Sequence, residues 1–153
     1  MNIKTTYISP HKSSLGMEAN VAVLVMYIIM VVLSWISVLG WVTWAVPLVF
    51  FFLEKQSRFV KFQAIQALLI AAASAVVSIV VRVLSWVFAP AATLNALSFF
   101  NPGLGIWALL NIIAALIGIA FFLIELYVLF MAYNWKQVEL PIIGPLAYKA
   151  SMR

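Results

Sequence analysis

Residues 19–53 read ANVAVLVMYIIMVVLSWISVLGWVTWAVPLVFFFL, a run in which no side chain is charged. A helix crosses a hydrocarbon core of about 30 Å with about 20 apolar residues, so this run is too long for one crossing. Ser37 to Gly40 supplies a turn, which predicts one membrane span over 19–36 and a second over 39–53. Pro47 lies in the second span and removes a backbone donor there, so we expect a kink.

The composition of the whole chain agrees with lipid as its solvent. Of the 153 residues, 67% are apolar and 8% are charged, whereas soluble domains are about half apolar and about a quarter charged. A soluble fold of this composition would expose large apolar patches. We therefore expect an integral membrane protein whose first apolar segment is an uncleaved span and not a signal peptide.

Two further apolar segments follow a short charged stretch. Residues 54–62, EKQSRFVKF, precede a third predicted span over 63–88. A linker without charge over 89–105 contains Asn101-Pro102-Gly103, a typical turn sequence, and leads to a fourth predicted span over 106–132.

The sequence therefore predicts an all-α membrane protein, a bundle of four transmembrane helices. Its expected parts are a polar N-terminal segment, a membrane domain and a basic tail, at 1–18, 19–132 and 133–153. Eight of the nine Lys and Arg residues lie in the first segment, the stretch 54–62 and the tail. Because short cytoplasmic segments carry the excess of basic residues, we expect both termini in the cytoplasm and the protein in the bacterial plasma membrane.

The stretch 54–62 carries its positive charge at regular intervals. Lys55, Arg58 and Lys61 recur every three residues, so one helical turn places them on one face. We expect this face to contact anionic lipid headgroups, with Phe59 and Phe62 turned towards lipid. A docking surface for a partner is the alternative.

Arg82 and Glu125 are the two ionisable residues inside predicted spans. Such residues cost a few kcal/mol at mid-membrane, so they usually face protein or water and often mark a site. Helical spacing places Ser74 and Ser78 on the stripe that holds Arg82, and Asn111 on the face that holds Glu125. We expect these two faces to meet each other, or each to meet another helix of the bundle.

Depth along the helices separates the two charges. Arg82 lies near the outer end of its span and Glu125 near the inner end of its own, which makes Asn111 the better neighbour for Arg82. Glu125 is then either a carboxyl that hydrogen-bonds across helices and fixes the bundle, or a proton or cation site, or a contact inside a larger complex. The sequence leaves these alternatives open.

The chain offers little for catalysis or metal binding. His11 is its single histidine, in a polar segment that we expect to be mobile, and the chain has no cysteine and no aspartate. Metal centres use several His, Cys or acidic ligands, and phosphate-binding enzymes use a glycine-rich loop. We therefore predict a non-enzymatic protein without a metal or cofactor. The basic residues flank the predicted spans, which favours lipid headgroups over nucleic acid as their partner.

Two segments resemble a known family. FVKFQAIQALL, residues 59–69, follows a Pro-Leu at 47–48, and the tail contains AYNWKQVELPIIGPLA, residues 132–147. Together they resemble a bacterial family of small four-span membrane proteins, a domain of unknown function (DUF4870-like) related to a Tic-type component of protein import in the chloroplast inner envelope. The resemblance implies the four-helix topology and supplies no activity.

The motif positions of this family are Pro47, Phe59, Gln63, Gln66 and Pro141 in this sequence. Two positions depart from the family pattern. The family's histidine is Gln63 here, so a titratable role for it does not transfer. The family's glycine after the alanine at 132 is also missing, with a tryptophan at 135 nearby.

These features predict a subunit or accessory protein of a larger membrane assembly, in transport or translocation. Its expected partners are the anionic bilayer and either another membrane protein or further copies of itself. The alternative is a small oligomeric channel or carrier for protons, ions or small solutes. A lipid-modifying enzyme would need a nucleophile next to a base, which the sequence does not show.

Overall fold

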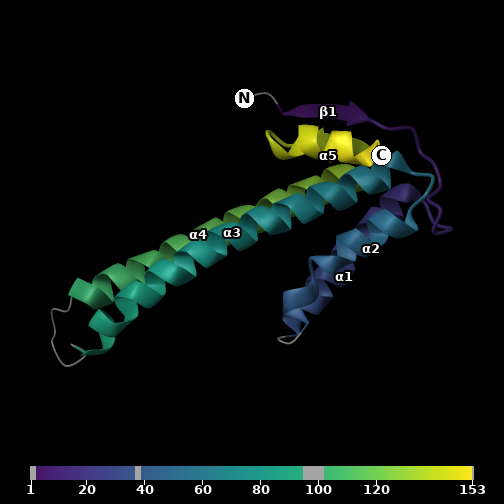
Figure 1. Ribbon diagram of the computed structural model, residues 1–153. Helices are drawn as coiled ribbons and strands as arrows, with labels where there is room; N and C mark the ends of the chain where they lie inside the picture. The colour runs from purple at the N-terminus through teal and green to yellow at the C-terminus, as the bar shows by residue number, and fades with distance from the viewer. Residues whose placement is uncertain (1–2, 37–38, 95–101, 153) are drawn as a thin grey trace. The chain divides into compact units, whose positions relative to one another are not determined.

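The computed structural model describes residues 3–36, 39–94 and 102–152. Helices dominate this part of the chain, and two short strands accompany them (Figure 1). The elements in order are β1 (Lys4–Tyr7), α1 (Ala19–Trp35), the 3-10 turn η1 (Gly40–Val42), α2 (Ala45–Leu53), α3 (Arg58–Leu94), α4 (Pro102–Tyr133), β2 (Lys136–Glu139) and α5 (Ile143–Ser151).

The chain divides into two compact units. The first comprises Met1–Ala72 and Ile124–Arg153, and the second comprises Ala73–Leu123. The first unit therefore contains both strands, α1, α2, α5 and the adjoining ends of α3 and α4. The second contains the remaining described parts of α3 and α4.

The core of the first unit forms on one face of α1 and on the beginning of α3. Buried residues recur every three or four positions along α1, at Ala19, Ala22, Val23, Met26, Tyr27 and Met30. This spacing is that of one helical face turned towards a core. On α3, Phe62 and Ile65 pack with Ala147 of α5, and Phe51 of α2 lies against this cluster.

The two ends of the chain meet in a small sheet. Strand β1 pairs with β2 in antiparallel register, with Lys4 opposite Glu139, and α5 packs against β2. A Cβ atom at Gly144 would lie 2.8 Å from the backbone of Glu139. Helix α5 therefore approaches β2 so closely that only glycine fits at this position. We call residues 3–18, 54–57 and 134–152 the polar cap.

Helices α3 and α4 are long and apolar enough to cross a membrane. Only 11% of the most apolar stretch of α3 and 6% of that of α4 is buried. A core helix of a soluble protein is mostly buried, so these helices do not have that role. Their exposed apolar side chains are instead those expected of helices in contact with lipid.

The predicted spans at 63–88 and 106–132 correspond to α3 and α4. The predicted spans at 19–36 and 39–53 differ from the helices α1 and α2 that the structure shows in their place. Helix α1 has 17 residues, about 25 Å at helical rise, and α2 has nine, about 14 Å. Helix α2 is too short to cross a core of about 30 Å alone. The structure therefore supports two membrane-length helices among the described residues, where the sequence predicted four. Residues 37–38 of the predicted turn lie outside the described residues.

The long helices also extend beyond their predicted ends. Helix α3 begins at Arg58, so most of the predicted charged loop is its first turn. It continues to Leu94, and α4 begins at Pro102. The predicted linker at 89–105 is correspondingly shorter, and what remains of it, 95–101, lies outside the described residues.

Candidate functional site: an open cavity in the polar cap

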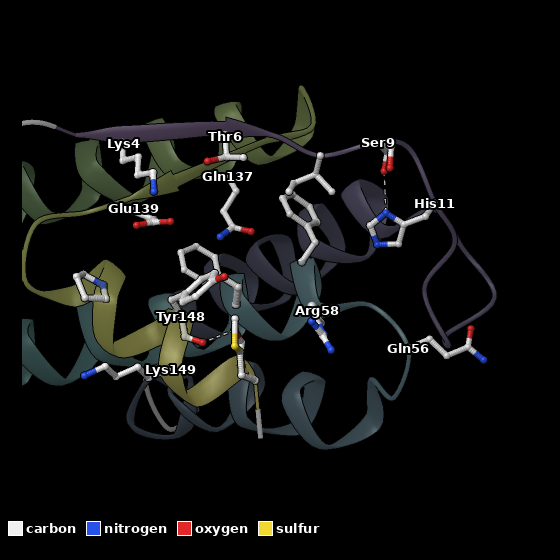
Figure 2. A pocket seen from close by; sticks show the side chains of 16 residues that line it. Lys4, Thr6, Ser9, His11, Gln56, Arg58, Gln137, Glu139, Tyr148 and Lys149 are labelled. Carbon is white, nitrogen blue, oxygen red and sulfur yellow. Dashed lines mark hydrogen bonds between the residues drawn. The ribbon is translucent and has the colours of Figure 1, made fainter.

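An open cavity of about 820 Å³ lies within the first unit. The strands β1 and β2, helix α5 and the start of α3 surround it. Figure 2 shows its labelled side chains on the sheet, at Lys4, Thr6, Gln137 and Glu139, and on the helices, at Arg58, Tyr148 and Lys149. All of these elements belong to one unit, so the cavity is a feature of the folded cap itself.

The sheet presents alternate residues to the cavity. Lys4 and Thr6 line it from β1, and Gln137 and Glu139 line it from β2. Successive side chains of a strand point to opposite faces, and Val138, between the last two, is fully buried. The two short strands therefore have one polar face on the cavity.

The lining of the cavity has an excess of positive charge. Lys4, Arg58 and Lys149 come from three different elements, and Glu139 is the single carboxylate among the lining residues that the structure describes. Phe62 and Met152 contribute apolar surface. The cavity thus combines cationic groups with an apolar wall.

Glu54 attaches the N-terminal segment to the loop between α2 and α3. Its carboxylate accepts hydrogen bonds from the backbone N–H of Ser14, at 3.0 and 3.3 Å, and from those of Gln56 and Ser57, both at 2.9 Å. Ser14 adds a bond from its hydroxyl to the carbonyl of Leu53. Glu54 itself is 1% exposed.

These hydrogen bonds change the acidity of Glu54. Burial alone raises the pKa of a carboxyl, because it disfavours the charged form. The donors that surround this carboxylate stabilise its charge and outweigh burial, so the pKa of Glu54 is lowered to about 2. The donors are the backbone N–H of Ser57, the hydroxyl of Ser13, and the backbone N–H groups of Ser14 and Gln56. Glu54 is therefore a charged anchor of the cap.

His11 is the second anchor of the cap. The sequence predicted a mobile segment around it, but the structure holds its side chain by hydrogen bonds. Its Nδ1 donates to the carbonyl of Ser9 at 2.9 Å, and its Nε2 accepts from the hydroxyl of Ser57 at 2.7 Å. Ser57 also accepts from the backbone N–H of Val60, so it caps the first turn of α3. The imidazole thereby ties the N-terminal segment to the start of α3.

Two aromatic rings enclose this imidazole. The ring centroids of Phe59 and Trp135 lie 6.4 and 5.7 Å from that of His11. Phe59 is 2% exposed, so it faces the core and not lipid as predicted. Trp135 has a φ of 60°, in the left-handed region that favours glycine. This strained position lies close to the one at which the resembled family carries its glycine.

The predicted intramembrane residues fall into different units. Arg82, Asn111, Ser74 and Ser78 line an open groove of about 460 Å³ between α3 and α4 in the second unit. Asn111 also donates to the carbonyl of Trp107 in its own helix, at 2.8 Å. Glu125 belongs to the first unit, where its carboxyl interacts electrostatically with Tyr27.

The positions that carry the family resemblance are mostly core positions. Pro47, Phe59, Gln63 and Gln66 are buried, whereas Pro141 is half-buried. The side-chain amides of Gln63 and Gln66 have no hydrogen-bond partner among the described residues. Burial of an amide without a partner costs free energy, so packing alone does not account for glutamine at these two positions.

The basic residues of the 54–62 stretch differ in how far their side chains are exposed. Lys55 and Arg58 are exposed, and Lys61 is half-buried with its ammonium 5.8 Å from the centre of the Phe51 ring. Phe62, which was predicted to face lipid, is 1% exposed and belongs to the core. Lys55 and Arg58 therefore remain available to headgroups.

Sequence reasoning missed the residues that hold the cap together. Glu54, Ser14 and Ser57 appeared only as members of polar stretches, because their partners lie far away in the sequence. One local signal was present: a serine immediately before a helix is a typical N-cap, and Ser57 occupies that place before α3. The contacts of Glu54 and His11 have no such local signature.

Comparisons with known proteins agree with a membrane location. The chain is 26% identical over 140 residues to UPF0132 membrane protein MJ1443 from Methanocaldococcus jannaschii. The aligned residues make up 92% of this chain and 94% of that protein. The sequence matches no family model, and no solved structure matches it. The similarity is to a membrane protein along nearly its whole length, and it does not extend specifically to the four-span family or the Tic-type component.

Proposed function

We propose that this chain is a non-enzymatic integral membrane protein of the plasma membrane, and that it serves as a subunit or accessory of a larger transport or translocation assembly. The groove in the second unit carries this proposal. Ala114 and Gly118 line it from α4, together with the serines of α3. Small residues let helix backbones approach closely, and hydroxyl and amide groups bond across membrane helices. An open groove of this kind fits a further helix.

The polar cap supports a topology with both termini on one side of the membrane. The pairing of β1 with β2 joins the two ends of the chain, and the bonds of Ser14 to Glu54 join the first end to the loop before α3. Each helical hairpin, α1 with α2 and α3 with α4, must then leave and return to the same side. The N-terminal segment, residues 54–62 and the tail contain eight of the nine basic residues, which favours the cytoplasm for that side.

Single-cysteine cross-linking in native membranes tests the proposed assembly. The chain has no cysteine, so one introduced thiol reports from one place. Ser78→Cys lies in the groove, and Val80→Cys is the matched control because Val80 is 53% exposed on the same helix and does not line the groove. We expect a short thiol-reactive photo-cross-linker to join Ser78→Cys to another polypeptide more efficiently than Val80→Cys.

The mass of the adduct then distinguishes the two kinds of partner. Twice the mass of the chain indicates a second copy, and any other mass indicates a different membrane protein. Equal cross-linking at both positions, or a lone homogeneous monomer after mild-detergent extraction with no adduct at either position, contradicts the proposal.

The polar lining of the same groove favours a second candidate, a small channel or carrier formed by several copies. Arg82 and Asn111 line the groove together with Ser74 and Ser78, and polar groups at membrane depth often line solute paths. Purified protein in proteoliposomes should then conduct protons, ions or small solutes. Asn111→Leu should lower this flux, whereas Ile112→Leu, on the exposed side of α4, should not. Glu125→Gln tests a separate proton or cation step.

A further inference from the structure

We propose that the cavity in the polar cap binds a phosphate group, presented by an anionic lipid headgroup or by free phosphate. The proposal needs no partner assembly, so it stands or falls separately from the proposed function. It rests on the cations that line the cavity, on the neutral donors between them and on the apolar wall beside them.

The cations that line the cavity come from segments that are distant in the sequence, and Figure 2 shows them at different margins of the cavity. Lys4 is on β1, Arg58 begins α3 and Lys149 is near the end of α5, and all three line the one cavity (Figure 2). A guanidinium presents a planar fork of donors that matches phosphate oxygens, and an ammonium adds a compact charge.

The other polar groups of the lining leave this charge largely uncompensated. Glu139 is directly opposite Lys4 in the register of the sheet, so its carboxylate offsets that lysine first. Arg58 and Lys149 lie on the helices across the cavity from the sheet (Figure 2). Tyr148 lies on the same helix as Lys149, lines the cavity and can donate a hydrogen bond to an oxyanion. The helix side is therefore the side that receives the phosphate.

The surroundings favour an amphiphile as the source of the phosphate. Phe62 and Met152 give the cavity an apolar wall. Met152, which follows α5 and lines the cavity, is 53% exposed, so an apolar side chain lies open at this site. A lipid can place its phosphate among the cations and its chains along these residues. A volume of about 820 Å³ exceeds what a free phosphate needs and suits a headgroup with its glycerol.

Binding to the purified full-length protein in an uncharged detergent tests the site. The probes are short-chain phosphatidic acid, the diacylglycerol of the same chain length, and inorganic phosphate alone, measured by calorimetry at physiological ionic strength. We expect saturable binding of phosphatidic acid and none of diacylglycerol. Inorganic phosphate that competes with equal strength would identify free phosphate as the source, and much weaker competition would identify the lipid.

Two double variants of equal charge separate the cavity from the surface in general. Arg58→Gln with Lys149→Gln removes two cations of the lining, and Lys55→Gln with Lys61→Gln removes two from the same basic region outside it. We expect the first pair to weaken binding about tenfold or more and the second less than about twofold, because Lys55 and Lys61 do not line the cavity and act on a bound phosphate only across salt-screened distance. Equal weakening by both pairs overturns the proposal, as does the absence of saturable binding to the unaltered protein.

A single variant covers the case in which the first pair disturbs folding. Lys149 is exposed on α5, so Lys149→Gln alone should leave the melting temperature unchanged and still weaken phosphatidic acid binding several-fold. Unaltered affinity in this variant, with the protein folded, contradicts the assignment of Lys149 to the site.

Discussion

The two units treat apolar side chains in opposite ways, although α3 and α4 run through both. In the first unit Phe62 of α3 is 1% exposed and Val128 of α4 is fully buried. In the second unit Ile79 of α3 is 61% exposed and Leu116 of α4 is 62% exposed. The buried part of α3 even contains the polar residues Gln63 and Gln66, so apolarity alone does not determine which segment becomes a core. The first unit has a polar cap, and the second has two helices whose apolar faces remain open to lipid or to a partner.

Polar contacts over long sequence distances explain why the first unit packs. The side-chain amide of Asn20 donates to the carbonyl of Tyr133, 113 residues further on, at 3.0 Å. Glu54 holds Ser14 across 40 residues. In the second unit, Asn111 instead bonds within its own helix. The comparison predicts that changes in the cap destabilise the protein, whereas comparable changes in the second unit are tolerated.

The largest effect should follow removal of the buried carboxylate. Glu54→Ala leaves several backbone N–H groups of the cap without an acceptor, so we expect a loss of about 3 kcal/mol in the free energy of unfolding. Denaturant unfolding in micelles measures it. Glu139→Ala, which removes a half-buried carboxylate of β2, is the control and should cost much less. Equal losses would show that Glu54 is not a special anchor.

The same carboxylate predicts how stability depends on pH. The pKa of Glu54 is lowered to about 2 in the folded protein from a usual value of 4.5. The charged carboxylate therefore makes its full contribution to the stability of the folded protein above about pH 4.5, and this contribution is lost as the pH falls towards 2. Melting temperatures across this range should fall more steeply for the unaltered protein than for Glu54→Gln. Parallel curves would contradict the assignment.

A smaller effect should separate two glycines, one in each unit. Gly144→Ala places a methyl group against the backbone of Glu139, and we expect a loss of about 2 kcal/mol as α5 moves away from β2. Gly118→Ala adds the same methyl group in the second unit, where nothing lies within 4 Å of the added carbon. It should be neutral or slightly stabilising, because alanine favours helix. Equal melting temperatures of the two variants would remove the contrast between the units.

The smallest effect should come from the imidazole. His11→Ala removes two hydrogen bonds and two ring contacts, and we expect a loss of about 1 kcal/mol. Lys12→Ala changes the next residue, which is exposed, and should leave stability unchanged. The intrinsic tryptophan fluorescence of the protein should also shift in the first variant and not in the second, because the Trp135 ring contacts His11. A cap that melts identically in both variants would mean that the N-terminal segment is held by other contacts.

The sequence was sufficient for features that depend on local composition. Long apolar runs predicted α3 and α4, and helical spacing grouped Ser74 and Ser78 with Arg82. The same reasoning overestimated the span at 39–53, because apolar composition does not reveal that the helix begins only at Ala45. Helix ends depend on backbone hydrogen bonds that a hydropathy pattern does not report.

The cap was beyond local reasoning because its contacts are not local. Strands β1 and β2 have four residues each and lie at opposite ends of the chain, so neither carries a recognisable pattern. His11 and Glu54 were interpreted as parts of polar segments, and only folding gives them their partners. The cationic cavity arises in the same way, from Lys4, Arg58 and Lys149 on three separate elements.

We propose that the N-terminal segment, the loop before α3 and the tail form one cap on one side of a membrane. Tyr7→Cys, Lys55→Cys and Met152→Cys place single thiols at exposed positions of these three segments. In sealed, oriented vesicles, a membrane-impermeant maleimide should label all three from the same side, and Gly105→Cys at the start of α4 from the other. Labelling of any one of the three from the opposite side to the other two would contradict the account.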